Sequence, residues 1–267
     1  MIYKTIDILG APLTFYVLDS YEDINPNRKR PMIIICPGGG YRFCSNREAE
    51  SIAICFNSFG FNCAVLKYTC NADGSNLKEP LFPLPLQQLA SSVSYVRQHA
   101  AELNTNADMI ATLGFSAGGH LVASLGCFWK DYGLSCRPDA QVLCYPVITS
   151  GKFAHKGSFD KLCVNNDVLK QKLSLENCVN ADVPATFIWH TRTDEGVPVE
   201  NSLLFVEALD RFNVPYELKL FDHGEHGMSL ANDEVKSAKH PTADKEIATW
   251  PNLVKDWLFT RFGNAWW

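Results

Sequence analysis

Two kinds of hydrophobic pattern follow one another along the chain. Residues 3–9 and 12–19 alternate apolar and polar side chains around Gly10-Ala11-Pro12, which predicts an antiparallel pair of strands at one edge of a sheet. Later segments are nearly continuous in apolar residues, which is typical of strands buried on both faces of a parallel sheet. These later strands are expected at residues 32–36, 61–68, 109–113, 139–147 and 185–191, and a final strand at residues 216–221.

Segments with helical spacing separate these strands. The clearest begins at Leu86 and ends near Leu103, with apolar residues three or four positions apart. Other helices are expected around residues 48–56, 119–125, 200–211 and 247–262. Strands that alternate with helices form a mostly parallel sheet. The sequence therefore predicts an α/β fold, a single domain over residues 1–267 with a central sheet of about eight strands flanked by helices.

Two segments interrupt this alternation. Residues 69–85 form a long Pro-rich loop, and long loops in compact domains often line a site. Residues 149–182 are polar and rich in Asn and Lys, with short helical patterns. We expect this second segment to be a small lid insertion over the site; a surface excursion without a role is the alternative.

Composition removes several classes of function. Apolar residues make up 46% of the chain and charged residues 20%, as in ordinary soluble domains. The formal charge of −5 offers no basic surface for nucleic acid, and no apolar run is long enough to cross a bilayer. The start of the chain carries Asp7 and no long apolar block, so we expect no signal peptide and a cytoplasmic location. The ten cysteines include no Cys-x-x-Cys pair and are expected to be reduced thiols without a metal.

The segment with the most specific chemistry is Gly114-Phe115-Ser116-Ala117-Gly118. It lies between an expected buried strand and an expected helix, the context in which Gly-x-Ser-x-Gly indicates a nucleophile. The turn there admits only small residues beside the serine and leaves its hydroxyl clear of the sheet. The N–H groups at the start of the helix point toward the same place. A plain strand-to-helix turn is the alternative.

A second candidate element, Pro37-Gly38-Gly39-Gly40-Tyr41, follows the strand at residues 32–36. Three consecutive glycines cost backbone entropy, and the close approach of a ligand atom to main-chain N–H groups is one reason to keep them. In hydrolases with this layout, the loop after an early central strand donates N–H groups to an oxyanion hole. A flexible turn is the alternative.

A serine nucleophile needs a base, and the base needs an acidic partner. Asp194 and His226 follow two later strands, and loops after parallel strands converge at one edge of the sheet. The order Ser, Asp, His is the one expected of this fold. Rivals remain: Glu195 and Asp222 for the acid, and His223 for the base.

Two further histidines lie close to these elements. His120, in the helix behind Ser116, is expected to be structural or, with Tyr41, a wall of the pocket. His190 lies inside a strand, and we expect packing alone to satisfy it.

With these motifs the chain resembles the α/β-hydrolase superfamily, and more narrowly the bacterial acetyl-xylan-esterase-like and feruloyl-esterase-like small carboxylesterases. The segments that carry the resemblance are residues 37–41, 47–50, 114–120, 173–176, 190–194, 197–202 and 224–227. The resemblance implies Ser116 as nucleophile, His226 as base and Asp194 as its partner. It also implies an oxyanion hole made by the N–H groups of Ala117 and of Gly39 or Gly40. Many esterases of the superfamily have His where this chain has Pro37, which leaves the donating glycine open.

The expected function is a serine carboxylesterase that hydrolyses short-chain acyl esters through an acyl-enzyme intermediate, with no metal or organic cofactor. The resemblance favours acetyl groups on a sugar alcohol, so the expected partner is a small-molecule ester such as an acetylated oligosaccharide. The sequence leaves open whether the protein forms a homo-oligomer. Two alternatives remain, an amide or peptide hydrolase with the same catalytic groups and a non-catalytic binding protein on a hydrolase fold.

Overall fold

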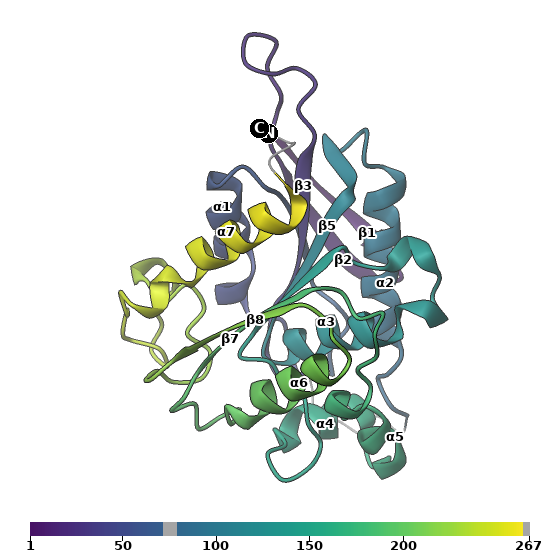
Figure 1. The fold of residues 1–267 in the computed structure, drawn as a ribbon, viewed down its shortest axis with the longest axis vertical. Coiled ribbons are helices and arrows are strands. Elements are labelled where there is room, and N and C mark those ends of the chain that lie inside the picture. The colour runs from purple at the N-terminus through teal and green to yellow at the C-terminus, as the bar shows by residue number, and fades with distance from the viewer. Residues whose placement is uncertain (72–78, 264–267) are drawn as a thin grey trace.

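The computed structural model describes residues 1–71 and 79–263, and its central feature is an eight-stranded sheet (Figure 1). The strand order is β1-β2-β4-β3-β5-β6-β7-β8. The strands are β1 (Ile2–Ile8), β2 (Ala11–Val17), β3 (Arg30–Cys36), β4 (Asn62–Leu66), β5 (Thr105–Phe115), β6 (Ala140–Cys144), β7 (Thr186–Thr191) and β8 (Tyr216–Phe221). β1 pairs with β2, and β2 with β4, in antiparallel fashion, and the other pairings are parallel. The predicted α/β fold is confirmed, including the antiparallel pair at one edge.

The middle strands are mostly apolar and buried because helices cover both faces of the sheet. In β3 every residue is buried, and neighbouring side chains point to opposite faces. Ile34 packs into the hydrophobic core on one face, whereas Ile33 and Ile35 pack into the core on the other.

Each face has its own set of helices. The core on one face includes side chains of α1 (Glu50–Ser58) and α7 (Trp250–Phe262), which lie together in Figure 1. The core on the other face includes side chains of α2 (Leu84–Gln98), α3 (Ala117–Phe128) and α6 (Glu200–Arg211). The result is a three-layer α/β/α arrangement in which the carboxyl ends of the parallel strands open at one edge.

Two strands differ from their expected bounds by three residues or more at one end. β5 begins at Thr105, four residues earlier than expected, because Thr105 pairs with Arg30 beside an irregularity in the β3–β5 ladder. β6 ends at Cys144, three residues earlier than expected. Tyr145 has a φ of 38°, which turns the chain out of the strand direction toward the edge of the sheet where Ser116 lies.

The segment over residues 149–182 contains α4 (Lys156–Cys163), α5 (Asp167–Lys172) and the short helix η4 (Leu175–Asn177). Both of its ends are held to the body of the protein. The Asn201 side chain accepts hydrogen bonds from the amides of Ile148 and Thr149, and the Trp129 indole donates to the Asp182 carbonyl at 3.1 Å. A moving lid stays a prediction.

Three further expectations concern the loop over residues 69–85, the cysteines and membrane-spanning helices. Of the expected loop over residues 69–85, residues 72–78 lie outside the described part of the chain. The ten cysteines are free thiols. Among the described helices, none is long and apolar enough to span a bilayer.

Candidate active site

Ser116 occupies a strained turn between β5 and α3. Its φ of 51° and ψ of −116° lie in a region that side chains other than glycine rarely adopt. The flanking glycines make the turn possible, because a Cβ on Gly114 would lie 2.2 Å from the Gly118 carbonyl oxygen. A Cβ on Gly118 would lie 2.1 Å from the Cys36 carbonyl oxygen. The Gly-x-Ser-x-Gly spacing thus lets α3 start in contact with β3 and directs the serine outward.

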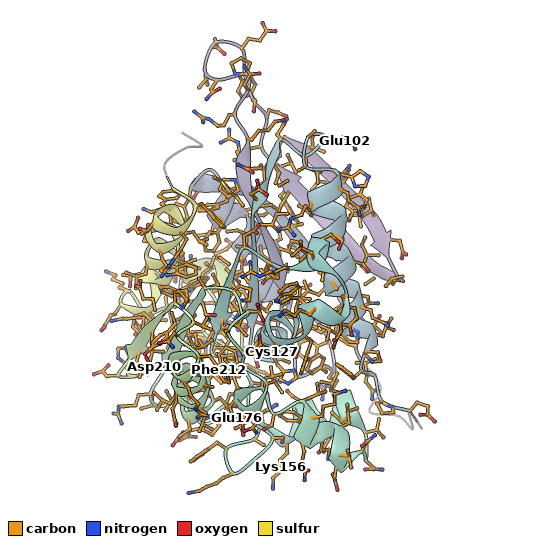
Figure 2. All side chains as sticks on the ribbon, turned by 45° about the vertical axis from the view of Figure 1, so that its right-hand side comes forward. Glu102, Cys127, Lys156, Glu176, Asp210 and Phe212 are labelled. Carbon is orange, nitrogen blue, oxygen red and sulfur yellow. The ribbon has the colours of Figure 1, made fainter. Side chains whose placement is uncertain are left out.

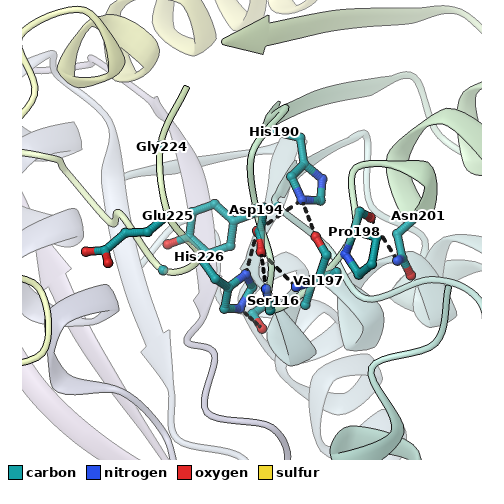
Figure 3. Close-up of polar contacts among 12 residues, drawn as sticks. Ser116, His190, Asp194, Val197, Pro198, Asn201, Gly224, Glu225 and His226 are labelled. Atoms are coloured by element: carbon teal, nitrogen blue, oxygen red, sulfur yellow. Dashed lines mark hydrogen bonds and ion pairs between the residues drawn. The ribbon is translucent and has the colours of Figure 1, made fainter. Parts of the chain in front are cut away.

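His226 lies within hydrogen-bond distance of Ser116, with 2.8 Å between Ser116 Oγ and His226 Nε2 (Figure 3). On the other side of the ring, His226 Nδ1 lies 2.7 Å from Asp194 Oδ2. Since a carboxylate accepts at Nδ1, the neutral ring carries its proton there and leaves Nε2 free to take the serine proton. The three residues form one continuous hydrogen-bonded chain.

Asp194 is held by four donors. Its Oδ1 accepts from the amides of Gly196 and Val197 at 2.9 and 2.7 Å, while Oδ2 accepts from His226 and His190. Burial by itself would raise the pKa of the Asp194 carboxyl, but these hydrogen bonds outweigh burial and hold its pKa well below the ordinary value. Asp194 therefore remains an anion facing the imidazole.

His190 differs from its sequence expectation. Its Nε2 donates to the Val197 carbonyl at 2.9 Å and lies 3.2 Å from Asp194 Oδ2. Its Nδ1 accepts from the Ser202 hydroxyl at 2.8 Å. The side chain is fully buried and helps to orient Asp194, so it does more than pack. The sequence held a signal for this role, because His190 lies near the end of β7 and only four residues before Asp194, close enough for the two side chains to meet.

The glycine loop after β3 lies directly against Ser116. A Cβ on Gly38 would come within 3.0 Å of the Ser116 Cβ and 2.9 Å of the Phe115 carbonyl oxygen. Gly39 and Gly40 have φ values of 129° and 65°. The Gly38 amide already donates to the Glu48 carboxylate at 2.8 Å. Glu48 therefore occupies the amide of Gly38 but not those of Gly39 and Gly40, the two glycines of the predicted oxyanion hole.

Glu48 is a second residue that sequence reasoning missed. This carboxylate is 4% exposed and lies in the short helix η1 (Asn46–Glu48). Its Oε1 accepts from the Tyr145 hydroxyl at 2.6 Å, and that hydroxyl accepts from the Ser229 amide at 3.0 Å. Glu48 thereby links the glycine loop, through Tyr145, to the chain just after His226. The one signal in the sequence was its place in residues 47–50, a segment that carries the family resemblance, which did not show what Glu48 does.

The rivals named from the sequence lie elsewhere. Glu195 is exposed. His223 binds Asp222 at 2.5 Å and Asp244 at 2.7 Å, and its pKa is raised to about 9 by these two carboxylates. Asp222 and His223, with Glu246, also form an exposed group that could hold a cation, but none of the three lines the cavity at Ser116.

Tyr41 and His120 lie behind Ser116 and support α3. The Tyr41 hydroxyl lies 2.9 Å from His120 Nδ1, and His120 Nε2 donates to the Leu173 carbonyl at 3.0 Å. Burial lowers the pKa of His120 to about 4. Both side chains are buried, and neither is among the residues lining the cavity at Ser116. Of the two expectations for His120, the structural one fits this position.

A cavity of about 510 Å³ opens in front of Ser116 and His226. Its other walls come from the glycine loop and the chain after it, from α4 with the residue before it, and from residues 227–240. The lining residues are Gly39, Gly40, Arg42, Phe43, Ser45, Arg47, Glu48, His155, Gly157, Lys161, Gly227, Lys239 and His240. Such a cavity is large enough for a small ester.

A sheet of this topology, with a serine on the turn after β5 and a histidine and an aspartate from the last strand ends, defines an α/β hydrolase. The model of the prolyl oligopeptidase family matches residues 86–243, and BD-FAE matches residues 18–137. The chain belongs to the prolyl oligopeptidase family of α/β hydrolases, and within these hydrolases it is acetylxylan-esterase-like.

Three similar proteins have names that describe an enzymatic activity. The acetyl ester-xyloside bifunctional hydrolase from Caldicellulosiruptor lactoaceticus is 38% identical with a TM-score of 0.80, over 95% of this chain and 88% of that one. The carboxylesterase Cest-2923 from Lactobacillus plantarum WCFS1 is 28% identical with a TM-score of 0.84, over 98% and 99%. Endo-1,4-beta-xylanase B of Butyrivibrio fibrisolvens is 36% identical over 80% of this chain. The chain spans 35 to 47% of the length of the curated relatives that it matches first.

Proposed function

We propose that the protein is a serine carboxylesterase that removes short acyl groups, chiefly acetyl, from sugars or oligosaccharides. The observation that carries this proposal is the chain of hydrogen bonds from Ser116 Oγ through His226 to Asp194, at 2.8 and 2.7 Å. This arrangement, at the mouth of a cavity of small-ligand size, is the minimum that acyl transfer by a serine requires.

In the first step, His226 Nε2 takes the proton of Ser116 as the hydroxyl oxygen attacks the ester carbonyl. Asp194, which stays ionised, stabilises the imidazolium that forms. His226 then gives this proton to the departing alcohol, which leaves an acyl group on Ser116. Water attacks the acyl enzyme with the same histidine as base, and the free acid is released.

The negative charge on the tetrahedral intermediate needs N–H donors. The Ala117 amide is in the first turn of α3, where N–H groups have no intrahelical acceptor. Gly39 or Gly40 would supply the second donor. Removing one such donor in serine hydrolases costs about 2.7–4 kcal/mol of transition-state stabilisation.

The substrate class rests on similarity. Among the similar structures, one is named for acetyl ester and xyloside hydrolysis and another as a carboxylesterase. These names support an ester substrate with a small acyl group. An exposed aromatic ring in the cavity wall, that of Phe43, is a suitable surface for a sugar ring.

A second candidate, hydrolysis of an amide or peptide, is favoured by one observation, the match of residues 86–243 to the prolyl oligopeptidase family. The same three residues could attack an amide, but an amine leaves less readily than an alcohol and must be protonated in place. Hydrolysis of a peptide anilide faster than that of any ester would favour this candidate.

The direct test measures hydrolysis of acetyl, butyryl, octanoyl and feruloyl esters by the wild type and by Ser116→Ala. We expect the wild type to be fastest on the acetyl ester and Ser116→Ala to lose at least about 10³-fold in kcat. A fluorophosphonate should label Ser116 in the wild type and nothing in the variant. Full activity of Ser116→Ala on every ester would reject the assignment of the nucleophile.

A further inference from the structure

The cavity in front of Ser116 is basic, although the chain as a whole is acidic. Its lining carries four permanently cationic side chains and one carboxylate, whereas the whole chain has a formal charge of −5. The four are Arg42, Arg47, Lys161 and Lys239. They come from segments far apart in the sequence, so the fold gathers them here.

Two of these charged side chains already have structural partners. Glu48 is occupied by the Gly38 amide and the Tyr145 hydroxyl. Arg47 donates to the carbonyls of Val235 and Gly227 at 2.6 and 2.8 Å, so it holds two loops together. Neither is therefore freely available to a ligand.

The other three cations have no acidic partner. Within the described part of the chain, no carboxylate lies within 4.0 Å of the side-chain nitrogens of Arg42, Lys161 or Lys239. Asp160, the residue before Lys161, pairs with Lys170, and Glu225 pairs with His240, which lines the same cavity.

Exposed lysines elsewhere behave in both ways. Lys130 and Lys236 pair with aspartates, whereas Lys152, Lys172 and Lys245 have no carboxylate within 4.0 Å in the described part of the chain. The cavity differs because three such cations surround one concavity. Three unpaired cations around one concavity create a positive potential there, and field lines concentrate in clefts with low-dielectric walls. A neutral sugar ester would make no use of this potential.

Phe43 adds a second recognition element beside the charges. Its side chain is 51% exposed, and the Arg42 guanidinium lies over its ring at 5.8 Å from the centroid. An aromatic face next to unpaired cations suits a sugar ring that carries a negative group.

We propose that the cavity rim formed by Arg42, Lys161 and Lys239 is an anion subsite, and that the substrate is a sugar ester bearing a carboxylate, such as an acetylated uronic acid unit. This inference rests on the proposed esterase function, since it names the substrate of that same site. The anion would dock on the rim while its ester carbonyl reaches Ser116.

The test compares two sugars that differ at one carbon, methyl glucoside and methyl glucuronide, each acetylated at the same hydroxyl. At low salt we expect the wild type to hydrolyse the glucuronide with a kcat/KM at least about 10-fold higher. This preference should shrink to within about 3-fold in 0.5 M NaCl, because salt screens exposed charges.

Variants then locate the effect. Lys161→Gln, Lys239→Gln and Arg42→Gln should each lower kcat/KM for the glucuronide about 3- to 10-fold and change that for the glucoside less than about 2-fold. The matched control is Lys156→Gln, which removes the same charge from the same helix as Lys161. Lys156 is exposed, is not among the residues lining the cavity and lies near the lower end of the molecule in Figure 2.

A binding measurement separates this inference from the esterase proposal. Calorimetric titration of Ser116→Ala with each sugar needs no turnover, and we expect the glucuronide to bind at least about 10-fold more tightly. Equal affinities, or an equal effect of Lys156→Gln and Lys161→Gln, would overturn the anion subsite whether or not esters are hydrolysed. A matching 6-sulfate sugar that bound better than the glucuronide would overturn the carboxylate assignment. Absence of ester hydrolysis together with a glucuronide preference in binding would reject only the esterase proposal.

Discussion

At the scale of single residues, the site depends on buried polar groups whose partners lie far away in the chain. Glu48 accepts from Gly38 on one side and from Tyr145 on the other, while Tyr145 in turn holds the Ser229 amide. One carboxylate thus fixes the position of the glycine loop and contributes to that of the chain after His226. Glu48 makes no hydrogen bond to Ser116, His226 or Asp194, so its role is positioning.

We expect Glu48→Ala to lower kcat at least about 10-fold on a short acetyl ester with little change in KM. The change leaves the Gly38 amide and Tyr145 hydroxyl without their acceptor, which costs about 1–3 kcal/mol and loosens the loop that would hold the oxyanion. Steady-state kinetics and urea unfolding measure the two effects.

The control for Glu48→Ala is Glu50→Ala, which removes an exposed carboxylate two residues along. It should leave kcat within about 2-fold of the wild type. Glu48→Gln keeps one acceptor oxygen and should recover much of the activity. Wild-type kcat in a folded Glu48→Ala protein would show that Glu48 does not position the loop.

At the scale of elements, the close contact between α3 and β3 explains the glycine pattern around Ser116. The Gly118 backbone faces the carbonyls of Cys36 and Pro37, so a methyl group there would lie 2.1 Å from the first and 2.5 Å from the second. Backbone atoms of a central strand cannot move aside cheaply. The start of α3 would have to shift instead, and Ser116 with it.

We expect Gly118→Ala to destabilise the protein by at least about 1–3 kcal/mol and to abolish measurable esterase activity. Urea unfolding gives the first quantity and hydrolysis of an acetyl ester the second. The matched substitution Gly157→Ala in the first turn of α4 meets only His155 at 3.5 Å, and its stability should equal or exceed that of the wild type. Equal stability of the two variants would mean that α3 is not constrained by β3.

At the scale of the whole molecule, the buried histidine His120 makes the stability of the fold depend on pH. The Nε2 of His120 donates to the Leu173 carbonyl of the 149–182 segment, and its Nδ1 faces Tyr41 of the glycine loop. Burial lowers its pKa from the ordinary 6.5 to about 4. Above pH 6.5 the ring is neutral in both folded and unfolded chains. Between pH 6.5 and 4, only the unfolded chain binds the proton, so stability decreases as the pH falls.

We expect this one histidine to lower the free energy of unfolding by about 1.4 kcal/mol for each pH unit between 6.5 and 4. In His120→Gln the slope should be smaller by nearly that amount, since glutamine can keep both hydrogen bonds and does not titrate. Urea unfolding at pH 7, 5.5 and 4.5 gives both slopes. Identical slopes would contradict the buried neutral state of His120.

The central strands and the candidate site residues could be predicted from the sequence because both leave a local pattern along the chain. The strands at residues 32–36 and 185–191 are buried on both faces, so their apolar runs identify them without knowledge of their neighbours. Ser116 and Asp194 could be nominated because each follows such a strand, and His226 because it follows the more polar last strand β8, since parallel strands end at one edge. The ends of the strands were harder to predict. β6 ends before Tyr145 because that residue has a positive φ, and an apolar run in the sequence gives no sign of such a turn.

The sequence by itself determined the α/β architecture and the residue types at the strand ends, because local periodicity and turn chemistry depend on neighbours in the chain. Only the tertiary structure decided that His190 and His226 share Asp194, that Glu48 joins two loops, and which cations surround the cavity. Those facts depend on distances between side chains that are separated by up to about two hundred residues, and on the partners that each charge finds or lacks. No pattern along the chain encodes such pairings, whereas folding places Arg42, Lys161 and Lys239 around one cavity.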